Sequence, residues 1–172
     1  IEADGPVLVA QYAVSINQCS GIIDPPYGDP EMLYLSPVEQ GVKNAYFYAT
    51  RKESIDLNFV NIIIPQSGLA SLLIDGSPAL PTEYFPHPAN PQYAVVVRRL
   101  FGAAAQHHLL SDSSFIASVY GAGYYESYAY NMGTRVNDLN TECSYKNILS
   151  SIGLSDTMTC PRSPFRLTVK LA

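Results

Sequence analysis

The segment FIASVYGAGYYESYAYNMGT, residues 115–134, decides how the fold is interpreted. Two short runs rich in aromatic and β-branched residues flank a glycine-containing connection, which is typical of two antiparallel strands joined by a turn. Alternation along the second run places Tyr128 and Tyr130 on one face of its strand. We expect Gly121 and Gly123 to give the connection backbone freedom, where there is little room for a side chain.

The tyrosines of this segment fit two roles, because a tyrosine combines an apolar ring with a polar hydroxyl. In an architectural role, Tyr128 and Tyr130 are at least half buried on a sheet face and their hydroxyls are hydrogen-bonded. In a recognition role, the turn residues Tyr124 and Tyr125 and the neighbouring Glu126 are the candidate binding residues. We expect the segment to be mainly architecture, with only the turn left to meet a partner.

Similar strand patterns recur along the chain between turn clusters such as DPPYGDP and FPHPANP. Helix signals are confined to one turn near residues 36–41 and to a short helix within residues 141–154. The sequence therefore predicts an all-β fold, an antiparallel β-sandwich or two packed sandwich-like halves, with less than about 15% helix. The other predicted strands cover residues 6–15, 31–38, 44–50, 59–65, 71–75, 92–100 and 107–111.

Two expectations concern the packing of these strands. The stretch ADGPVLVAQYA, residues 3–13, lines up with SDSSFIASVYG, residues 111–121. The match suggests a repeated unit in which Asp4 and Asp112 cap a turn before a core strand. The predicted core residues are Val7, Val9, Leu33, Leu35, Ile62, Ile64, Leu72, Val95, Val97, Phe115 and Val119.

Composition limits the classes of partner. The chain of 172 residues has a mild net charge of −5 and no run of basic residues, so it lacks the electrostatic signature of a protein that binds nucleic acid or an anionic membrane. No apolar stretch approaches the roughly 18 residues that span a bilayer. We therefore expect no nucleic-acid partner and no membrane span in this stretch, and we look to the tyrosines for a protein or glycan ligand.

The composition changes after Asn140. We expect a β domain over residues 1–140 that lacks its N-terminal part, because Ile1 already lies inside a strand pattern. A Ser/Thr/Asn-rich linker follows over residues 141–156. Residues 157–172 form a strand that either closes this domain or opens a following module.

Three cysteines are widely spaced, which is compatible with an extracellular protein. Cys143 and Cys160 flank the predicted linker and are the expected disulfide pair, because closing that loop stabilises the chain by roughly 3 kcal/mol. In the alternative, Cys160 pairs with a cysteine beyond residue 172, so all three thiols would be free in the 172-residue chain by itself.

The sequence offers little catalytic or metal-binding chemistry. His107 and His108 are adjacent on a predicted strand and so point to opposite faces, which prevents them from chelating one ion together. The acids Asp24, Asp29 and Glu31 lack the spacing of a known calcium loop, so we expect them in a solvated surface loop. No nucleophile elbow, phosphate loop or zinc-protease motif is present. We expect no enzyme activity, no metal and no cofactor, although two carboxylates distant in the chain can still meet in a fold.

The ordered stretches GPVLVAQY, GDPEMLYLSPVEQ, FVNIIIP, SLLIDG and HHLLSDSSFIASVYGAGYYESYAYNMGT resemble the IgGFc-binding protein N-terminal domain family over roughly residues 3–140. The form present here is similar to the version found in surface or secreted proteins of Bacteroidetes. The tail TCPRSPFRLTV is similar to the first strand of the Ig-like modules that follow in such chains. The resemblance implies an extracellular, non-catalytic β module, at the cell surface or secreted, suited to adhesion or protein binding.

Three functions follow as hypotheses. The first is an adhesive or protein-binding module of a larger multidomain protein, which needs no deep polar pocket. The second is a carbohydrate-binding module, which needs at least two coplanar exposed aromatic rings. The third is a glycosidase-like enzyme, which needs two convergent carboxylates in a cleft.

Overall fold

The computed structural model describes residues 4–5, 7–13, 27–102 and 104–135 in full. It also describes the backbone of two strands near the C-terminus, β11 (Thr141–Asn147) and β12 (Phe165–Leu171), which pair antiparallel with each other. The chain divides into two compact units, residues 1–135 and residues 136–172. The first unit carries the candidate functional residues.

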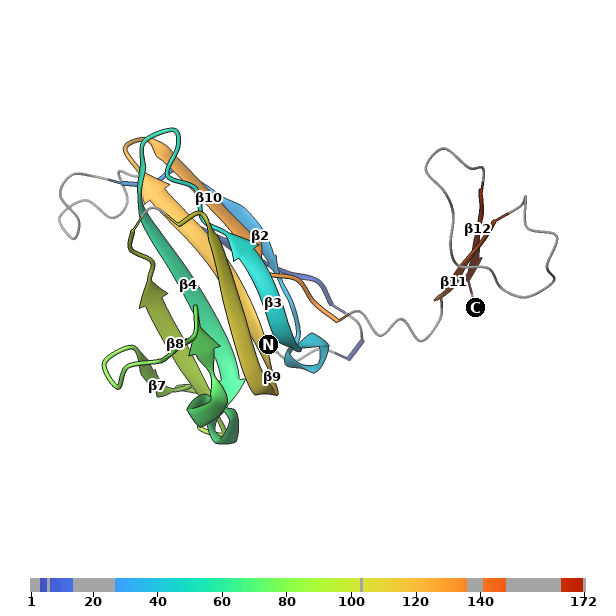
Figure 1. The fold of residues 1–172 in the computed structure, drawn as a ribbon, viewed down its shortest axis with the longest axis horizontal. Coiled ribbons are helices and arrows are strands. Elements are labelled where there is room, and N and C mark those ends of the chain that lie inside the picture. The colour runs from blue at the N-terminus through green and yellow to red at the C-terminus, as the bar shows by residue number, and fades with distance from the viewer. Residues whose placement is uncertain are drawn as a thin grey trace. The chain divides into compact units, whose positions relative to one another are not determined.

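The strand β9 (Gln106–Gly123) organises the first unit (Figure 1). Its N-terminal half pairs with β3 (Val42–Tyr48) and β5 (Leu73–Ile74), and its C-terminal half pairs with β4 (Ile55–Pro65) and β10 (Glu126–Asn131). All of these pairs are antiparallel. One long strand therefore links two groups of partners, which curl around a shared interior.

Shorter strands extend this arrangement. The strand β8 (Tyr93–Arg99) pairs with β4 and with β7 (Tyr84–Pro86), while β6 (Ser77–Pro78) pairs with β5. The strands β1 (Val9–Tyr12) and β2 (Met32–Leu35) form a separate two-stranded sheet. The β1–β2 sheet has no ladder with the main sheet in the described residues.

The predicted fold class is confirmed. The sheets are antiparallel and curl into a sandwich-like half-barrel, and strands make up about 55% of the residues that are described in full. Helix in the described residues is limited to two short 3₁₀ segments, Val38–Gln40 and Gln66–Ser71. The first of these lies within the single helical turn that the sequence predicted near residues 36–41.

The core lies between the curled halves of the main sheet. Along β9 every second residue from Phe115 to Gly123 points inward, and along β4 the even-numbered residues from Asn58 to Ile64 do the same. This alternation is the period of a strand with one buried face. The predicted core residues Ile62, Ile64, Leu72, Phe115 and Val119 are fully buried, as expected.

Two parts of the core prediction are wrong. On β8 the buried side chains are Ala94 and Val96, whereas the predicted Val95 and Val97 lie half-buried on the opposite face. The run QYAVVVRRL is apolar without alternation, so it does not indicate which face is inside.

The second error concerns the β1–β2 sheet. Val7 is 61% exposed and Leu35 is 39% exposed, while Val9 and Leu33 are only partly buried. These apolar residues belong to a small peripheral sheet rather than to the interior, and a strand pattern does not reveal which sheet a strand joins.

The proposed internal repeat is also wrong. Asp112 lies in the middle of β9, which runs without interruption from residue 106 to residue 123, so Asp112 caps no turn. The stretch from Val9 to Tyr12 is a four-residue peripheral strand, so the two stretches occupy different environments.

In the second unit, β11 lies within the segment predicted to be a linker. The side chains of Cys143 and Cys160 are outside the described residues, so their disulfide stays a prediction. The strand β11 occupies the first half of the segment 141–154 in which a short helix is predicted, and residues 148–154 lie outside the described residues.

Candidate functional site

The hairpin between β9 and β10 ends in a two-residue turn of tyrosines. Gly123 and Glu126 are paired across the strands, which leaves Tyr124 and Tyr125 as the turn. Their side chains are 54% and 58% exposed, and their rings meet edge-to-face with centroids 4.5 Å apart. Tyr125 has φ of 58°, a left-handed conformation that non-glycine residues rarely adopt. We call Tyr124, Tyr125 and Glu126 the tyrosine tip.

The two tyrosines of β10 are structural, as predicted. Tyr128 and Tyr130 pack against the core from β10, and burial raises the pKa of the Tyr128 hydroxyl to about 12. The Tyr128 hydroxyl donates to Asn58 Oδ1, and the Tyr130 hydroxyl donates to the backbone oxygen of Tyr48. The backbone N–H of Tyr48 donates back to the Tyr130 oxygen over 2.9 Å. These hydrogen bonds give each tyrosine hydroxyl a partner, although its ring is largely buried.

The expected role of the two glycines needs a correction. Gly121 and Gly123 lie inside β9, and the unusual backbone conformation of the turn belongs to Tyr125 instead. Both positions require glycine because a side chain there would collide with neighbouring atoms. A Cβ on Gly123 would lie 1.7 Å from the carbonyl oxygen of Ser54, and a Cβ on Gly121 would lie 2.3 Å from the ring of Tyr128.

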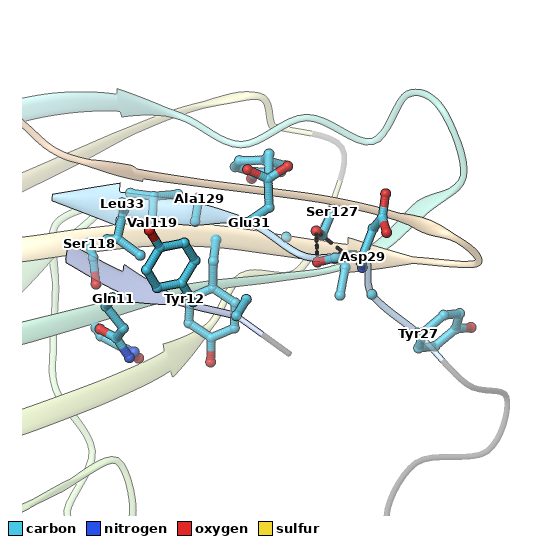
Figure 2. Close-up of a pocket in the computed structure, with 17 residues that line it drawn as sticks. Gln11, Tyr12, Tyr27, Asp29, Glu31, Leu33, Ser118, Val119, Ser127 and Ala129 are labelled. Carbon is cyan, nitrogen blue, oxygen red and sulfur yellow. Dashed lines mark hydrogen bonds between the residues drawn. The ribbon is translucent and has the colours of Figure 1, made fainter. Parts of the chain in front are cut away.

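Three segments meet at this end of the sheet. The backbone N–H of Gly28 donates to the Gly123 carbonyl over 2.9 Å, and the Ser127 hydroxyl donates to the Asp29 carbonyl over 2.7 Å (Figure 2). The turn before β4 contributes Glu53 and Ser54, whose φ values are 50° and 61°. Left-handed non-glycine residues therefore gather at the end that carries the tyrosine tip. Such strain persists only where the surrounding structure holds it, and it clusters at functional sites.

A cavity of about 430 Å³ adjoins the tyrosine tip, between the β1–β2 sheet and the outward face of β4, β9 and β10 (Figure 2). It has the size of a small-molecule or side-chain site. Carboxylates, amides, hydroxyls and aromatic rings all contribute to its wall. The lining residues that carry polar groups are Gln11, Tyr12, Tyr27, Asp29, Glu31, Asn61, Ser118, Tyr120, Ser127 and Tyr128.

Two residues on the floor of this cavity are unusual. Tyr120 stacks on Phe59 with ring centroids 5.1 Å apart, and burial raises the pKa of its hydroxyl against the opposing effect of a hydrogen bond from Asn61. The Oδ1 atom of Asn61 is hidden from solvent and has no hydrogen-bond partner in the described part of the chain. A buried acceptor without a partner is rare in folded proteins.

The histidines behave as the sequence predicted. His107 is buried, with Nδ1 lying 2.7 Å from Asp75 Oδ2, while His108 lies on the other face, stacked on Tyr46. Asp75 also accepts from the His108 backbone N–H over 2.9 Å, and thereby ties the Asp75–Gly76 turn to β9. Within residues 4–5, 7–13, 27–102 and 104–135, no three metal-ligating side chains gather.

Sequence reasoning found the tyrosine tip but missed the cavity. It treated Asp29 and Glu31 as part of a solvated loop, whereas both line the cavity wall. It did not identify Asn61 or Tyr120 as site residues. Both lie on the outward face of their strands. The available signal in the sequence was a polar residue, Asn61, and an aromatic residue, Tyr120, each within an otherwise apolar run.

A family model described as IgGFc binding protein matches residues 1–121, which is more than two thirds of the chain. The chain belongs to the IgGFc-binding protein family. This agrees with the resemblance seen in the sequence. No curated protein and no solved structure matches the chain.

The stretch matched to the IgGFc-binding protein family includes most of the cavity wall, from Gln11 on β1 to Gly121 on β9. The tyrosine tip follows three residues after the last matched residue. In the part of the chain that the structure describes, no helix is long and apolar enough to cross a membrane.

Proposed function

We propose that this chain is a non-catalytic, protein-binding module of a larger extracellular or cell-surface protein, and that its tyrosine tip contacts the partner. Membership of the IgGFc-binding protein family supports a protein ligand. Tyrosines that expose large, rigid rings at low entropic cost are common contact residues in protein interfaces. Adhesion by a Bacteroidetes surface protein, with Ig-like modules continuing from residues 157–172, is the biological setting we propose.

The observation that carries this proposal is the exposure of the tip. The rings of Tyr124 and Tyr125 contribute little to the core, and Tyr125 adopts a backbone conformation that asparagine or glycine would hold more easily. Folding alone does not favour two tyrosines at this turn. A contact with a partner gives a physical reason for their presence.

Carbohydrate binding is the second candidate. Flat stacking against a sugar calls for coplanar exposed rings, but the planes of Tyr124 and Tyr125 are 78° apart. The tip itself therefore favours a protein surface over a sugar ring.

A glycosidase-like activity is the third candidate. Asp29 and Glu31 line one cavity, as a carboxylate pair would. Asp29, however, is exposed, whereas a general acid is usually shielded from water so that its proton is retained near neutral pH. We therefore rank this candidate last.

The test is a binding comparison between the unaltered chain and the double variant Tyr124→Ser, Tyr125→Ser. Each is immobilised and exposed to an antibody Fc fragment, a panel of secreted proteins and a glycan array. We expect a protein ligand that the unaltered chain binds and the double variant loses, with unchanged thermal stability. Binding of glycans alone would favour the second candidate, and equal binding by both chains would remove the tip from the interface.

A further inference from the structure

The cavity beside the tyrosine tip is acidic. Asp29 and Glu31 both line it, and neither forms an ion pair with a described residue. No lysine or arginine is among the described lining residues.

The basic residue with a recognisable influence at this end is Arg99. Desolvation and then Asp56 raise the pKa of the Tyr27 hydroxyl, and Arg99 opposes this shift. Arg99 does not line the cavity, and its guanidinium carbon lies 5.0 Å from the ring centre of Phe101. The negative charge of the cavity wall therefore has no compensating cation in the described wall.

One buried acceptor on the floor of the cavity has no hydrogen-bond partner in the described residues. Asn61 lies on the outward face of β4, opposite Ser118 of β9, and its Oδ1 atom is unpaired. A buried acceptor without a partner costs about 1–3 kcal/mol. The terminal torsion of an asparagine side chain is soft, so the amide can turn toward a donor that a ligand brings.

Aromatic rings complete the wall. Tyr12, Tyr27 and Tyr120 line the same space as the two carboxylates. A ring face attracts a cation that lies within about 6 Å of its centre. Carboxylates, an unpaired amide oxygen and tyrosine rings together favour a ligand that is cationic, planar and rich in donors. An arginine side chain has all three properties, because its guanidinium carries five N–H donors and no acceptor.

We propose that this cavity receives an arginine side chain of the protein partner, next to the contact made by the tyrosine tip. The inference rests on the proposed protein-binding function and names the chemistry of the residue that is recognised. The guanidinium bonds to the carboxylates of Asp29 and Glu31 and supplies the donor for Asn61 Oδ1. A neutral sugar would fill the same volume but would leave both carboxylates uncompensated.

The test is an NMR titration of the isotope-labelled 172-residue chain with Nα-acetyl-arginine amide. The matched ligand control is Nα-acetyl-citrulline amide, which has nearly the same shape but no charge. We expect saturable shifts at the amides of Gly28 and Ser118–Ala122 and at the side-chain amide of Asn61. The citrulline derivative should bind at least about tenfold more weakly.

Variants check the site. Glu31→Gln and Asp29→Asn should each weaken arginine binding by about tenfold, as the loss of roughly 1.4 kcal/mol predicts. Asp112→Asn is the control, since it removes an exposed acid from the distant half of β9 and should leave binding unchanged. Absence of saturable shifts, an equal response to citrulline, or equal weakening by Asp112→Asn would each overturn the proposal. Shifts caused by N-acetylglucosamine and not by the arginine derivative would overturn it in favour of a sugar site.

Failure of this inference can be told apart from failure of the proposed function. The arginine derivative probes the cavity alone, and the double variant of Tyr124 and Tyr125 probes the tip alone. A protein ligand that needs the tip while the arginine derivative does not bind overturns the inference and leaves the proposed function intact. Arginine binding without any protein ligand overturns the proposed function instead.

Discussion

The turn and the second strand of one hairpin carry two pairs of tyrosines in opposite environments. Tyr128 and Tyr130 on β10 lie against the core with both hydroxyls bonded to the chain, whereas Tyr124 and Tyr125 at the turn are more than half exposed. The same side chain therefore serves packing in one place and is available for contact a few residues away. The difference arises from the pairing register, which places residues 128 and 130 on the inward face opposite Gly121 and Val119.

The largest effect is expected where the inner side of the hairpin meets the turn before β4. Gly123→Ala places a Cβ against the backbone of Ser54 and Ile55, which can move only if the strand moves. We expect a loss of at least about 3 kcal/mol in the free energy of unfolding, measured by chemical denaturation. Gly121→Ala should cost less, because its new Cβ meets the side chains of Tyr128, Asn58 and Ile55, which can shift. Tolerance of Gly123→Ala would contradict the close approach of these strands.

A direct comparison of the two pairs comes next. Tyr128→Ala removes a ring packed on the core and leaves Asn58 Oδ1 without its donor, so we expect a loss of about 3 kcal/mol. Tyr124→Ala removes an exposed ring and should change stability by less than about 0.5 kcal/mol. Thermal and denaturant unfolding of both variants would measure this. The reverse ranking would mean that the inward face of β10 is assigned wrongly.

Alkaline titration should distinguish the buried hydroxyl of Tyr128 from that of an exposed tyrosine by its higher pKa. The pKa of Tyr128 is about 12 in the folded chain, against the ordinary tyrosine value of 10.0, because burial disfavours the phenolate. A raised folded-state pKa means that this stabilising contribution is complete below pH 10 and is lost as the pH rises toward 12. We expect the ultraviolet titration difference between the unaltered chain and Tyr128→Phe to show a late-titrating phenol. A difference spectrum centred at the ordinary tyrosine value would contradict its burial.

The smallest effect is expected at the turn itself. Tyr125→Gly relieves a left-handed backbone at φ of 58° and gives up little buried surface. We expect stability to rise by about 0.5 kcal/mol or to stay unchanged, measured by denaturant unfolding. If the same variant no longer binds a protein ligand, Tyr125 serves binding although its backbone conformation lowers stability. A large loss of stability would instead make Tyr125 a structural residue.

The sequence predicted local features well, because each depends on neighbouring residues. Short β-branched and aromatic runs between turn clusters indicated the strands, and the alternation of Ser127, Tyr128, Ala129 and Tyr130 indicated which tyrosines share a face. The exposed turn followed from the same pattern. The ordered motifs also carried the family resemblance, which the matched stretch of residues 1–121 supports.

Only the tertiary structure decided what depends on residues far apart in the chain. The run from Ala94 to Val97 is apolar throughout, so its inward face was fixed by the register with β4 rather than by its composition. The site beside the tip joins Gln11, Asn61 and Tyr120 from three different strands. No local pattern brings such residues together, because sheet pairing and the placement of the β1–β2 sheet do so, and the unpaired oxygen of Asn61 becomes visible only once its neighbours are in place.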